Sequence, residues 1–255
     1  MDHIASYLAG FRTIDLENLN QIKLMKRYDQ KFTFHKDQLP MVFDYLSRNH
    51  QVLELGDHRV FTYDNLYFDT HDRLFYRQHH DRRVNRYKLR CRKYLETGQC
   101  FFEIKFKNNK KKTIKTRLLL GDANISDELS EESKTFARNA GSMLGGTIVD
   151  TVDPSLWIRF NRITFANLAS QERLTFDMNL TYTDMRSNSQ KIDNLIIAEL
   201  KSEGASMNSP FSQYLKDIKI FPSKFSKYCM GLAIMEEDIK QNRFKKKILK
   251  LKNLM

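Results

Sequence analysis

The sequence lacks several features that would place it quickly in a protein class. It has no run of about 18 apolar residues, which excludes a transmembrane helix. It contains neither the G-x-x-x-x-G-K-[ST] loop nor the G-x-G-x-x-G motif, so any phosphate binding must depend on side chains. A G-x-S-x-G nucleophile elbow is missing as well. The first residues, MDHIASYLAGF, have no basic segment followed by a long apolar one, so we expect no secretory signal.

Cysteine is scarce. Cys91, Cys100 and Cys229 are an odd number of thiols and lack the close spacing of metal ligands. Cys91 and Cys100 could face each other across a hairpin, but a free cysteine usually packs in a core. Few and unpaired cysteines favour reduced thiols, so we expect a cytoplasmic protein.

What the sequence has in excess is positive charge. The 255 residues carry a formal net charge of +12, and 41% of them are hydrophobic. That apolar content is enough for a folded core and excludes general disorder. The charge predicts an anionic partner, which can be a nucleic acid, a phosphate compound or a lipid surface.

Much of this charge alternates with apolar residues between positions 86 and 117. Turns at Thr97-Gly98 and Asn108-Asn109 divide the stretch into three strands, and side chains on a strand point to opposite faces with a period of two. Each strand therefore has an apolar face and a charged one. The charged positions are Lys88, Arg90 and Arg92, then Glu103, Lys105 and Lys107, then Lys115 and Arg117. Lys107, Lys110, Lys111 and Lys112 surround the second turn, where we expect them to attract substrate.

Five further segments have strand character, which makes eight strands. They cover residues 23–34, 60–70, 157–166, 172–182 and 194–202. Helices are expected over 1–22, 36–49, 126–140, 211–218 and 224–251, and an acidic insertion ends at Gly145-Gly146. We predict an α+β protein built on an eight-stranded antiparallel β-barrel with flanking helices. The alternative is a half-buried sheet with a solvated charged face.

Further charged residues continue the pattern on the other strands. The cations are Lys31, Arg162, Arg173 and Lys201, and the acids among them are Asp177 and Glu199. Basic residues inside a barrel need an anion, because uncompensated buried charge is costly. Glu103, Asp177 and Glu199 either pair with the bases or supply a ligand for Mg²⁺ or Mn²⁺. We interpret Glu103 as a partner that orients bases and prefer Glu199 as the metal ligand.

The segment PSKFSKYCMG holds Ser223, Lys224, Ser226 and Lys227 at the start of a predicted helix. A helix N-terminus binds phosphate readily, although an ordinary cap beside surface lysines has the same pattern. His79-His80 is interpreted as a polar surface turn.

The order of these pieces resembles the VTC domain, the polyphosphate polymerase branch of the triphosphate tunnel metalloenzymes, in a bacterial stand-alone form. The matching pieces are RYDQKF at 27–32, YFDTHD at 67–72, KLRCRKY at 88–94, FEIKFK at 102–107, KTR at 115–117, FNR at 160–162, ERLTFD at 172–177, AELK at 198–201 and SKFSKY at 223–228. The resemblance implies a basic tunnel in which the γ-phosphoryl of ATP passes to a polyphosphate chain.

The resemblance also implies roles for individual residues. The catalytic residues would be Arg90, Arg92, Lys105, Arg162 and Glu199, with Glu199 holding Mn²⁺ or Mg²⁺. Those binding ATP, triphosphate or polyphosphate would be Lys31, Lys88, Lys115, Arg117, Arg173, Lys201, Lys224, Ser226 and Lys227. The tunnel domain would span 23–235, between a helix over 1–22 and a basic helical tail over 236–255.

Two departures from the family pattern are informative. The hydrolase and cyclase branch opens with Glu-x-Glu-x-Lys, whereas this sequence has Arg27-x-Asp29-x-Lys31, which argues against that branch. Eukaryotic relatives carry an inositol-phosphate-sensing domain and membrane helices, neither of which is in this sequence. We therefore expect regulation by other proteins.

Other functions stay open at this point. One is a metal-dependent hydrolase of tripolyphosphate or nucleoside triphosphates, and another is a non-enzymatic polyphosphate-binding module. We expect no nucleic-acid partner, since no platform for base stacking is visible. The tail RFKKKILKLK either contacts a membrane protein or the anionic inner face of a membrane, or is a solvated helix.

Overall fold

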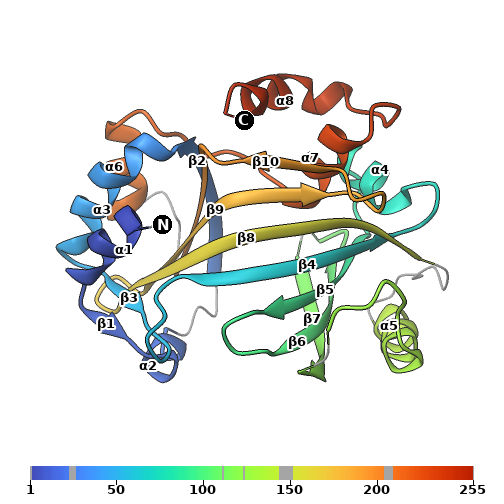
Figure 1. Ribbon diagram of the computed structural model, residues 1–255, viewed down its shortest axis with the longest axis horizontal. Coiled ribbons are helices and arrows are strands. Elements are labelled where there is room, and N and C mark those ends of the chain that lie inside the picture. Colours follow the sequence, from blue (N-terminus) through green and yellow to red (C-terminus); the bar gives the residue numbers. More distant parts are fainter. Residues whose placement is uncertain are drawn as a thin grey trace.

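The computed structural model of the chain describes residues 2–22, 27–110, 112–122, 124–143, 152–203 and 209–254. Lys111 and the Gly145-Gly146 pair, named above for a barrel mouth and the end of an insertion, lie outside these ranges. The strands form one large sheet, and the helices pack around it (Figure 1). Each described helix is too short or too polar to cross a membrane.

The strands are β1 (Thr13–Ile14), β2 (Arg27–His35), β3 (Gln51–Leu53), β4 (Phe61–Asp69), β5 (Arg86–Tyr94), β6 (Cys100–Lys107), β7 (Thr113–Gly121), β8 (Asp153–Asn167), β9 (Glu172–Thr183), β10 (Ser189–Ile192) and β11 (Leu195–Glu203). The α-helices are α1 (Asp2–Ala9), α2 (Leu16–Asn20), α3 (Leu39–Ser47), α4 (Leu74–His80), α5 (Glu131–Met143), α6 (Pro210–Asp217), α7 (Lys227–Met235) and α8 (Lys245–Lys252). Two short 3₁₀ helices are η1 (Lys36–Gln38) and η3 (Asn242–Phe244).

The eight predicted strands form the main path of the sheet, in the order β2-β11-β9-β8-β4-β5-β6-β7. The closed eight-stranded barrel is wrong in two respects. The sheet has 11 strands, because the short β1, β3 and β10 pair beside the main path, and no pairing between β2 and β7 closes it within the described residues. Alternation along a strand tells which side chains share a face, whereas closure depends on strand tilt and stagger, which alternation does not encode.

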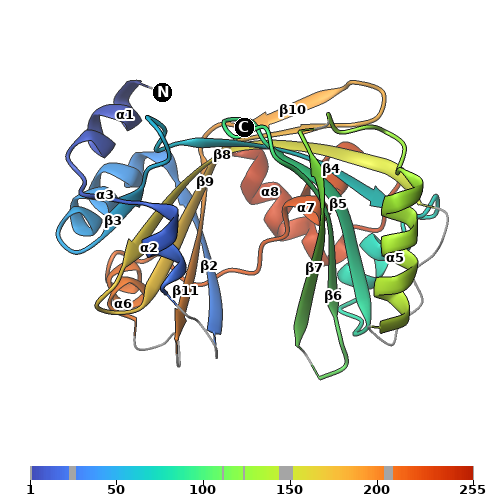
Figure 2. The same ribbon diagram turned by 90° about the horizontal axis from the view of Figure 1, so that it is seen from below.

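The open sheet is strongly curved. Figure 2 shows it as an arch, with β2 and β11 on one side, β6 and β7 on the other, and α7 and α8 between them. The charge of Lys31 in β2 acts on Lys105 in β6, so these two strands face each other although they do not pair. The strands at the two ends of the sheet therefore face each other across the inside of the arch.

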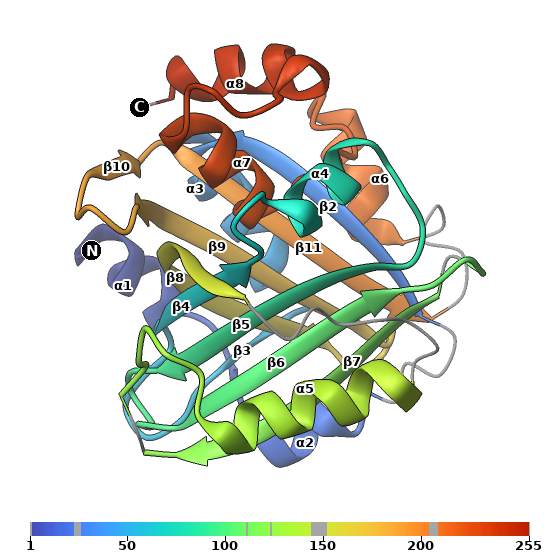
Figure 3. The same cartoon turned by 90° about the vertical axis from the view of Figure 1, so that its right-hand side faces the viewer.

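Apolar side chains on the outside of the arch explain where the helices pack. The rings of Phe165 and Phe176 on the sheet pack against Phe43 of α3 and Phe211 of α6. All four side chains are almost fully buried. Each such side chain contributes about 1.5–3 kcal/mol on burial. A second cluster includes Phe102 and Ile104 of β6 and packs against α5, which Figure 3 shows lying along the outside of β6 and β7.

Several helix predictions need correction. Residues 2–22 form α1, β1 and α2 rather than one helix, and α5 begins at Glu131 rather than at Ser126. The predicted helix over 224–251 is interrupted after α7, because Glu236 adopts an extended backbone. His79-His80 is not a surface turn: both residues belong to α4, and His80 is buried.

Helix α7 lies unusually close to the sheet. A Cβ atom at Gly231 would come within 2.5 Å of the Tyr182 ring and 2.6 Å of Leu156, so only glycine fits there. This close approach sets the position of the residues that precede α7 on the inside of the arch.

Candidate functional site: a charged face inside the arch

Strand register collects the charged residues of β5, β6 and β7 on one face. The directly opposed pairs are Lys88 with Lys105, Arg90 with Glu103, Glu103 with Arg117, and Lys105 with Lys115. Residues opposite one another in an antiparallel pair point to the same side of the sheet. These side chains form the first half of what we call the charged face.

The other half comes from β2, β8, β9 and β11. The opposed pairs are Lys31 with Glu199, Asp29 with Lys201, Lys201 with Arg173, and Arg162 with Asp177. The curvature of the sheet turns this half toward the first. The charged face thus brings together residues separated by more than a hundred positions in the sequence.

Three carboxylates of the charged face each contact two cations. Glu103 contacts Arg90 and Lys115, Asp177 contacts Arg162 and Lys227, and Glu199 contacts Lys31 and Lys201. Burial alone would raise the pKa of all three carboxyls, but the adjacent cations outweigh it and hold each pKa well below its usual range. All three are therefore ionised and tie bases of different strands together.

Aromatic rings support the guanidinium groups. The Tyr63 ring centroid lies 4.9 Å from the guanidinium carbons of both Arg92 and Arg162. Phe160 stacks on Tyr63, with ring centroids 5.2 Å apart. Cation–π contact of this kind holds arginine planes in place.

Tyr63, Asn65 and Tyr67 were not identified as site residues from the sequence. Asn65 accepts a hydrogen bond from Nε of Arg92 at 2.7 Å, and the Tyr67 hydroxyl accepts one from Nη1 of Arg90 at 2.8 Å. Their two-residue spacing on β4 was the available signal, since it is the period that places side chains on one face.

The segment of residues 222–227, which we call the arm, joins the charged face from outside the sheet. Ser223 donates its backbone N–H to the carbonyl of Lys31 at 2.7 Å, and Nζ of Lys31 donates to the carbonyl of Phe225 at 3.4 Å. Ser226 caps α7 and accepts a 2.6 Å hydrogen bond from Nζ of Lys88. Lys227 then reaches Asp177.

A buried hydrogen bond anchors the arm at its end. Tyr228, the residue after Lys227, donates its hydroxyl to Oδ2 of Asp69 at 2.6 Å. Asp69 is fully buried and also accepts backbone N–H bonds from Phe75 and Tyr76 at the start of α4. Figure 3 shows α4 and α7 side by side where this contact is made.

The remaining predicted residues lie at the border of the charged face. Arg117 is exposed and stacks on Phe101 at 4.7 Å. Lys224 is more exposed than Ser223 and Phe225 on either side of it, and all three line a cavity on the α8 side. In the described structure Lys224 makes no contact with Glu103, Asp177 or Glu199.

Several lysines of the charged face and the arm have lowered pKa values. Burial, together with repulsion from Arg162 and Lys31, lowers the pKa of Lys227 to about 7 despite the Asp177 contact. Desolvation by surrounding protein and the charges of Lys31 and Lys88 lower the pKa of Lys105 to about 8, although water still reaches its exposed side chain. Crowded cations with depressed pKa values are typical of an anion-binding site.

The described residues contain no group of three or more His, Cys, Asp or Glu side chains that could hold a metal ion by themselves. Glu199 is half-buried on the charged face, and its Oε2 lies 3.4 Å from Nζ of Lys31. Mg²⁺ is commonly bound by one or two carboxylates together with substrate phosphates and water. Glu199 therefore fits a metal whose other ligands come from a bound phosphate compound.

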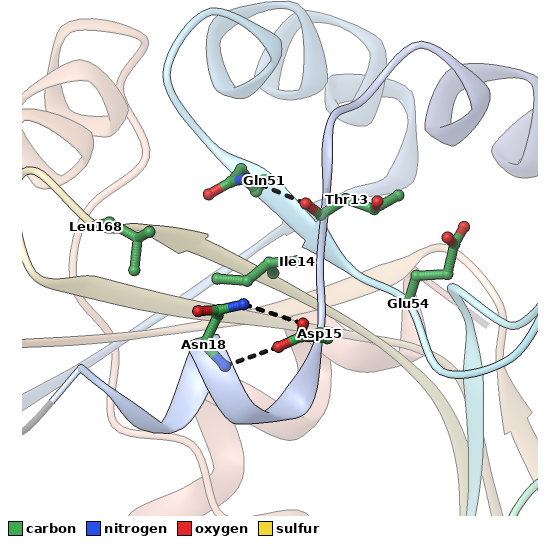
Figure 4. Close-up of a pocket in the computed structure, with 7 residues that line it drawn as sticks. All are labelled: Thr13, Ile14, Asp15, Asn18, Gln51, Glu54 and Leu168. Carbon is green, nitrogen blue, oxygen red and sulfur yellow. Dashed lines mark hydrogen bonds between the residues drawn. The ribbon is translucent and has the colours of Figure 1, made fainter.

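A cavity of about 420 Å³ lies apart from the charged face and shares none of its residues. Its lining includes Asp15 and Asn18 of the α2 turn and Glu54 (Figure 4). Asp15 caps α2 by accepting from the backbone and side-chain nitrogens of Asn18, and Glu54 pairs with Arg59. These carboxylates already have partners, so the cavity adds nothing to the candidate site.

Comparison with known proteins gives one family. A model of the VTC domain matches residues 26–236. A search of curated proteins finds no match.

Solved structures show weaker likeness. A Hippeastrum protein, described as a candidate adenylyl cyclase with a dominant triphosphatase activity, is 15% identical with a TM-score of 0.49, covering 80% of this chain and 94% of its own. A candidate adenylate cyclase from Bacillus halodurans is 15% identical with a TM-score of 0.48, covering 78% and 92%. One from Vibrio parahaemolyticus is 12% identical with a TM-score of 0.43, covering 81% and 97%.

Proposed function

The chain belongs to the VTC domain family, and from this membership we propose that its charged face binds ATP and polyphosphate and transfers the γ-phosphoryl of ATP to the end of the chain. In this reaction a terminal phosphate oxygen of polyphosphate forms a bond to the γ-phosphorus. The bond from that phosphorus to the β,γ-bridging oxygen breaks, and ADP leaves. The acceptor is itself a phosphate oxygen, so the reaction requires no protein nucleophile.

One observation carries the proposal: the charged face holds more cations than its carboxylates neutralise. Lys88 donates to a serine hydroxyl and Arg92 to an amide oxygen, both uncharged acceptors. Lys105 makes no hydrogen bond or ion pair with any residue described. Excess buried or crowded positive charge is costly unless an anion compensates it, and a polyphosphate chain supplies negative charge along its whole length.

Arginines and lysines of the charged face have different roles in the proposed binding of phosphate. Arg162 uses Nε and Nη2 on Asp177, which fixes the guanidinium plane and leaves Nη1 for a phosphate oxygen. Arg90 is also fixed, because its Nε donates to Glu103 and its Nη1 donates to the Tyr67 hydroxyl. A guanidinium already fixed in place loses little entropy when it binds phosphate. Lys31, Lys105 and Lys115 add point charge along the chain.

A divalent ion fits this arrangement through Glu199. Mg²⁺ or Mn²⁺ held by this carboxylate and by phosphate oxygens would neutralise charge that develops on the transferred group. Lys31 and Lys201, which contact Glu199, would then turn to phosphate oxygens.

The test is incubation of the protein with ATP and Mn²⁺, followed by assays for ADP and for acid-insoluble phosphate chains. The proposal predicts that both products accumulate together. Orthophosphate release without chains would identify a hydrolase of tripolyphosphate or nucleoside triphosphates instead. Binding of polyphosphate without any turnover would identify a binding module.

The basic C-terminal helix bears on the proposed location at a membrane. α8 buries Ile248 and Leu251 against the protein, so most of its apolar side is already covered. Its exposed lysines, such as Lys245, Lys246 and Lys252, together with the exposed Leu249, remain for an anionic membrane surface or an acidic membrane-protein partner. We expect such contact to be weak and abolished by salt, which sedimentation with anionic vesicles would measure.

A further inference from the structure

A second cavity, of about 470 Å³, lies between the edge of β2, the chain leading into the arm, and α8. Its volume falls within the range of about 300–1,000 Å³ that is typical of small-molecule sites. The residues that line it are Thr33, Phe34, His35, Gln38, Leu195, Lys219, Ile220, Phe221, Ser223, Lys224, Phe225, Lys247, Lys250, Leu251 and Leu254. It shares none of the strand residues of the charged face, and Ser223, Lys224 and Phe225 of the arm contribute to its lining.

The floor and the rim of this cavity differ in chemistry. Leu195, Ile220 and Leu251 are at most 4% exposed and form an apolar floor together with Phe34 and Phe225. Lys219, Lys224 and Lys250 are exposed, and Lys247 is half-buried, so the amines belong to the rim. No lining residue in the described chain is acidic.

Among the described residues, none of the rim lysines has a carboxylate partner. Lys247 donates to the backbone carbonyl of Lys224 rather than to an acid. Burial and the nearby charges of Lys224 and Arg82 lower the pKa of Lys247. An apolar floor beneath a ring of lysines is complementary to a molecule with an apolar body and an anionic head.

We infer that this cavity binds an amphipathic phosphate ester, a soluble molecule with a single aliphatic or aromatic body and a phosphate head. The apolar body would lie on Ile220, Phe225 and Leu251, and the head would lie among Lys219, Lys247 and Lys250. Phosphate suits the rim because several ammonium groups can share its oxygens. The enclosed volume suits a drug-sized ligand rather than a two-chain lipid. This inference goes beyond the proposed function and does not depend on phosphoryl transfer.

The experiment is calorimetric titration of the full chain with dodecyl phosphate below its micellar concentration. We expect saturable binding at one site and no binding of dodecanol, which lacks the head. The double variant Lys219→Gln/Lys250→Gln should bind about tenfold more weakly, because two charge-assisted contacts are lost. The matched control Lys245→Gln/Lys246→Gln removes the same charge from the first turn of α8, outside the cavity, and should bind within about twofold of wild type.

A variant of the charged face tests whether this cavity binds independently of the proposed function. Arg90→Ala, which removes a base of the charged face, should leave dodecyl phosphate binding unchanged, and tripolyphosphate should not displace the probe. The inference is overturned by absence of saturable binding, by equal weakening in the two double variants, or by displacement with tripolyphosphate. Displacement by phosphatidic acid vesicles would also overturn it, because the ligand would then be a bilayer lipid.

Discussion

Arg162 of β8 lies directly opposite Asp177 of β9, and its guanidinium donates from Nε and Nη2 to the two carboxylate oxygens at 2.5 and 2.8 Å. Asp177 is 3% exposed and also contacts Lys227 of the arm. One carboxylate therefore connects two strands and the arm, and it orients the planar group that we propose binds phosphate.

The variant Arg162→Lys tests whether the two-point hydrogen bonding of the guanidinium contributes to phosphate binding in addition to its charge. Lysine keeps the positive charge but cannot hold both oxygens of Asp177, so we expect tripolyphosphate affinity to fall about tenfold. Arg159→Lys is the matched control, because Arg159 makes the same two-point contact with Asp64 but is exposed, outside the charged face. Calorimetry on both variants checks this, and equal losses would contradict it.

The variant Glu199→Gln separates metal use from anion binding. We expect ATP turnover to be abolished while the fold is retained. Without the carboxylate, Lys31 and Lys201 lose their shared acidic partner, so metal-free tripolyphosphate should bind at least as tightly as to wild type. The measurements are ADP production with Mn²⁺ and metal-free binding. Full turnover by a folded variant would remove Glu199 from the mechanism.

The lowered lysine pKa values predict proton uptake on binding. With pKa values of about 7 for Lys227 and about 8 for Lys105, both amines are charged below about pH 6 and lose charge as the pH rises through those values. A bound polyanion raises both pKa values, so affinity falls as the pH rises above about 7, and binding near pH 8 takes up about one proton. Because solvent screens the exposed Lys105, we assign most of the uptake to Lys227.

Calorimetry in Hepes and in Tris, which differ in ionisation enthalpy, measures the uptake. Lys227→Arg should remove most of it, because arginine does not lose its proton in this range. Lys245→Arg, an exposed substitution on α8, should leave it unchanged. Undiminished uptake in Lys227→Arg would show that the proton binds elsewhere.

The anchor of the arm predicts a loss of stability in Tyr228→Phe. The variant leaves the buried Asp69 carboxylate one donor short, which should lower the free energy of unfolding by about 1–3 kcal/mol. Tyr214→Phe is the control, since the Tyr214 hydroxyl donates to the Met41 carbonyl at the surface. Urea unfolding measures both, and we expect Tyr214→Phe to lose less than about 1 kcal/mol. Similar losses would mean that Asp69 keeps its partners by rearrangement.

The period of two along each strand was sufficient to predict which charged residues share a face. Arg90, Glu103 and Lys105 alternate with Leu89, Phe102 and Ile104, and the latter three are fully buried on the opposite side. The same period of two was available for Tyr63, Asn65 and Tyr67, but these residues are uncharged, so the search for charged residues did not select them.

Other features depend on relationships that a local pattern does not contain. Asp69 and Tyr228 meet across 159 residues, and nothing near either one indicates the other. β1 has two residues, too few for alternation to be detected. Closure of the sheet depends on the edges β2 and β7, whose own sequences look like those of closed-barrel strands. The break between α7 and α8 coincides with the extended backbone of Glu236 and has no proline or glycine signal.

The most direct test of the central claim, that the inside of the arch encloses a phosphate chain, is a crystal structure of the protein soaked with tripolyphosphate. The account predicts phosphate density between the two halves of the charged face, within hydrogen-bond distance of Arg90, Lys105 and Arg162. Density confined to the lysines of α8, with the charged face unchanged and its carboxylate pairs intact, would contradict it.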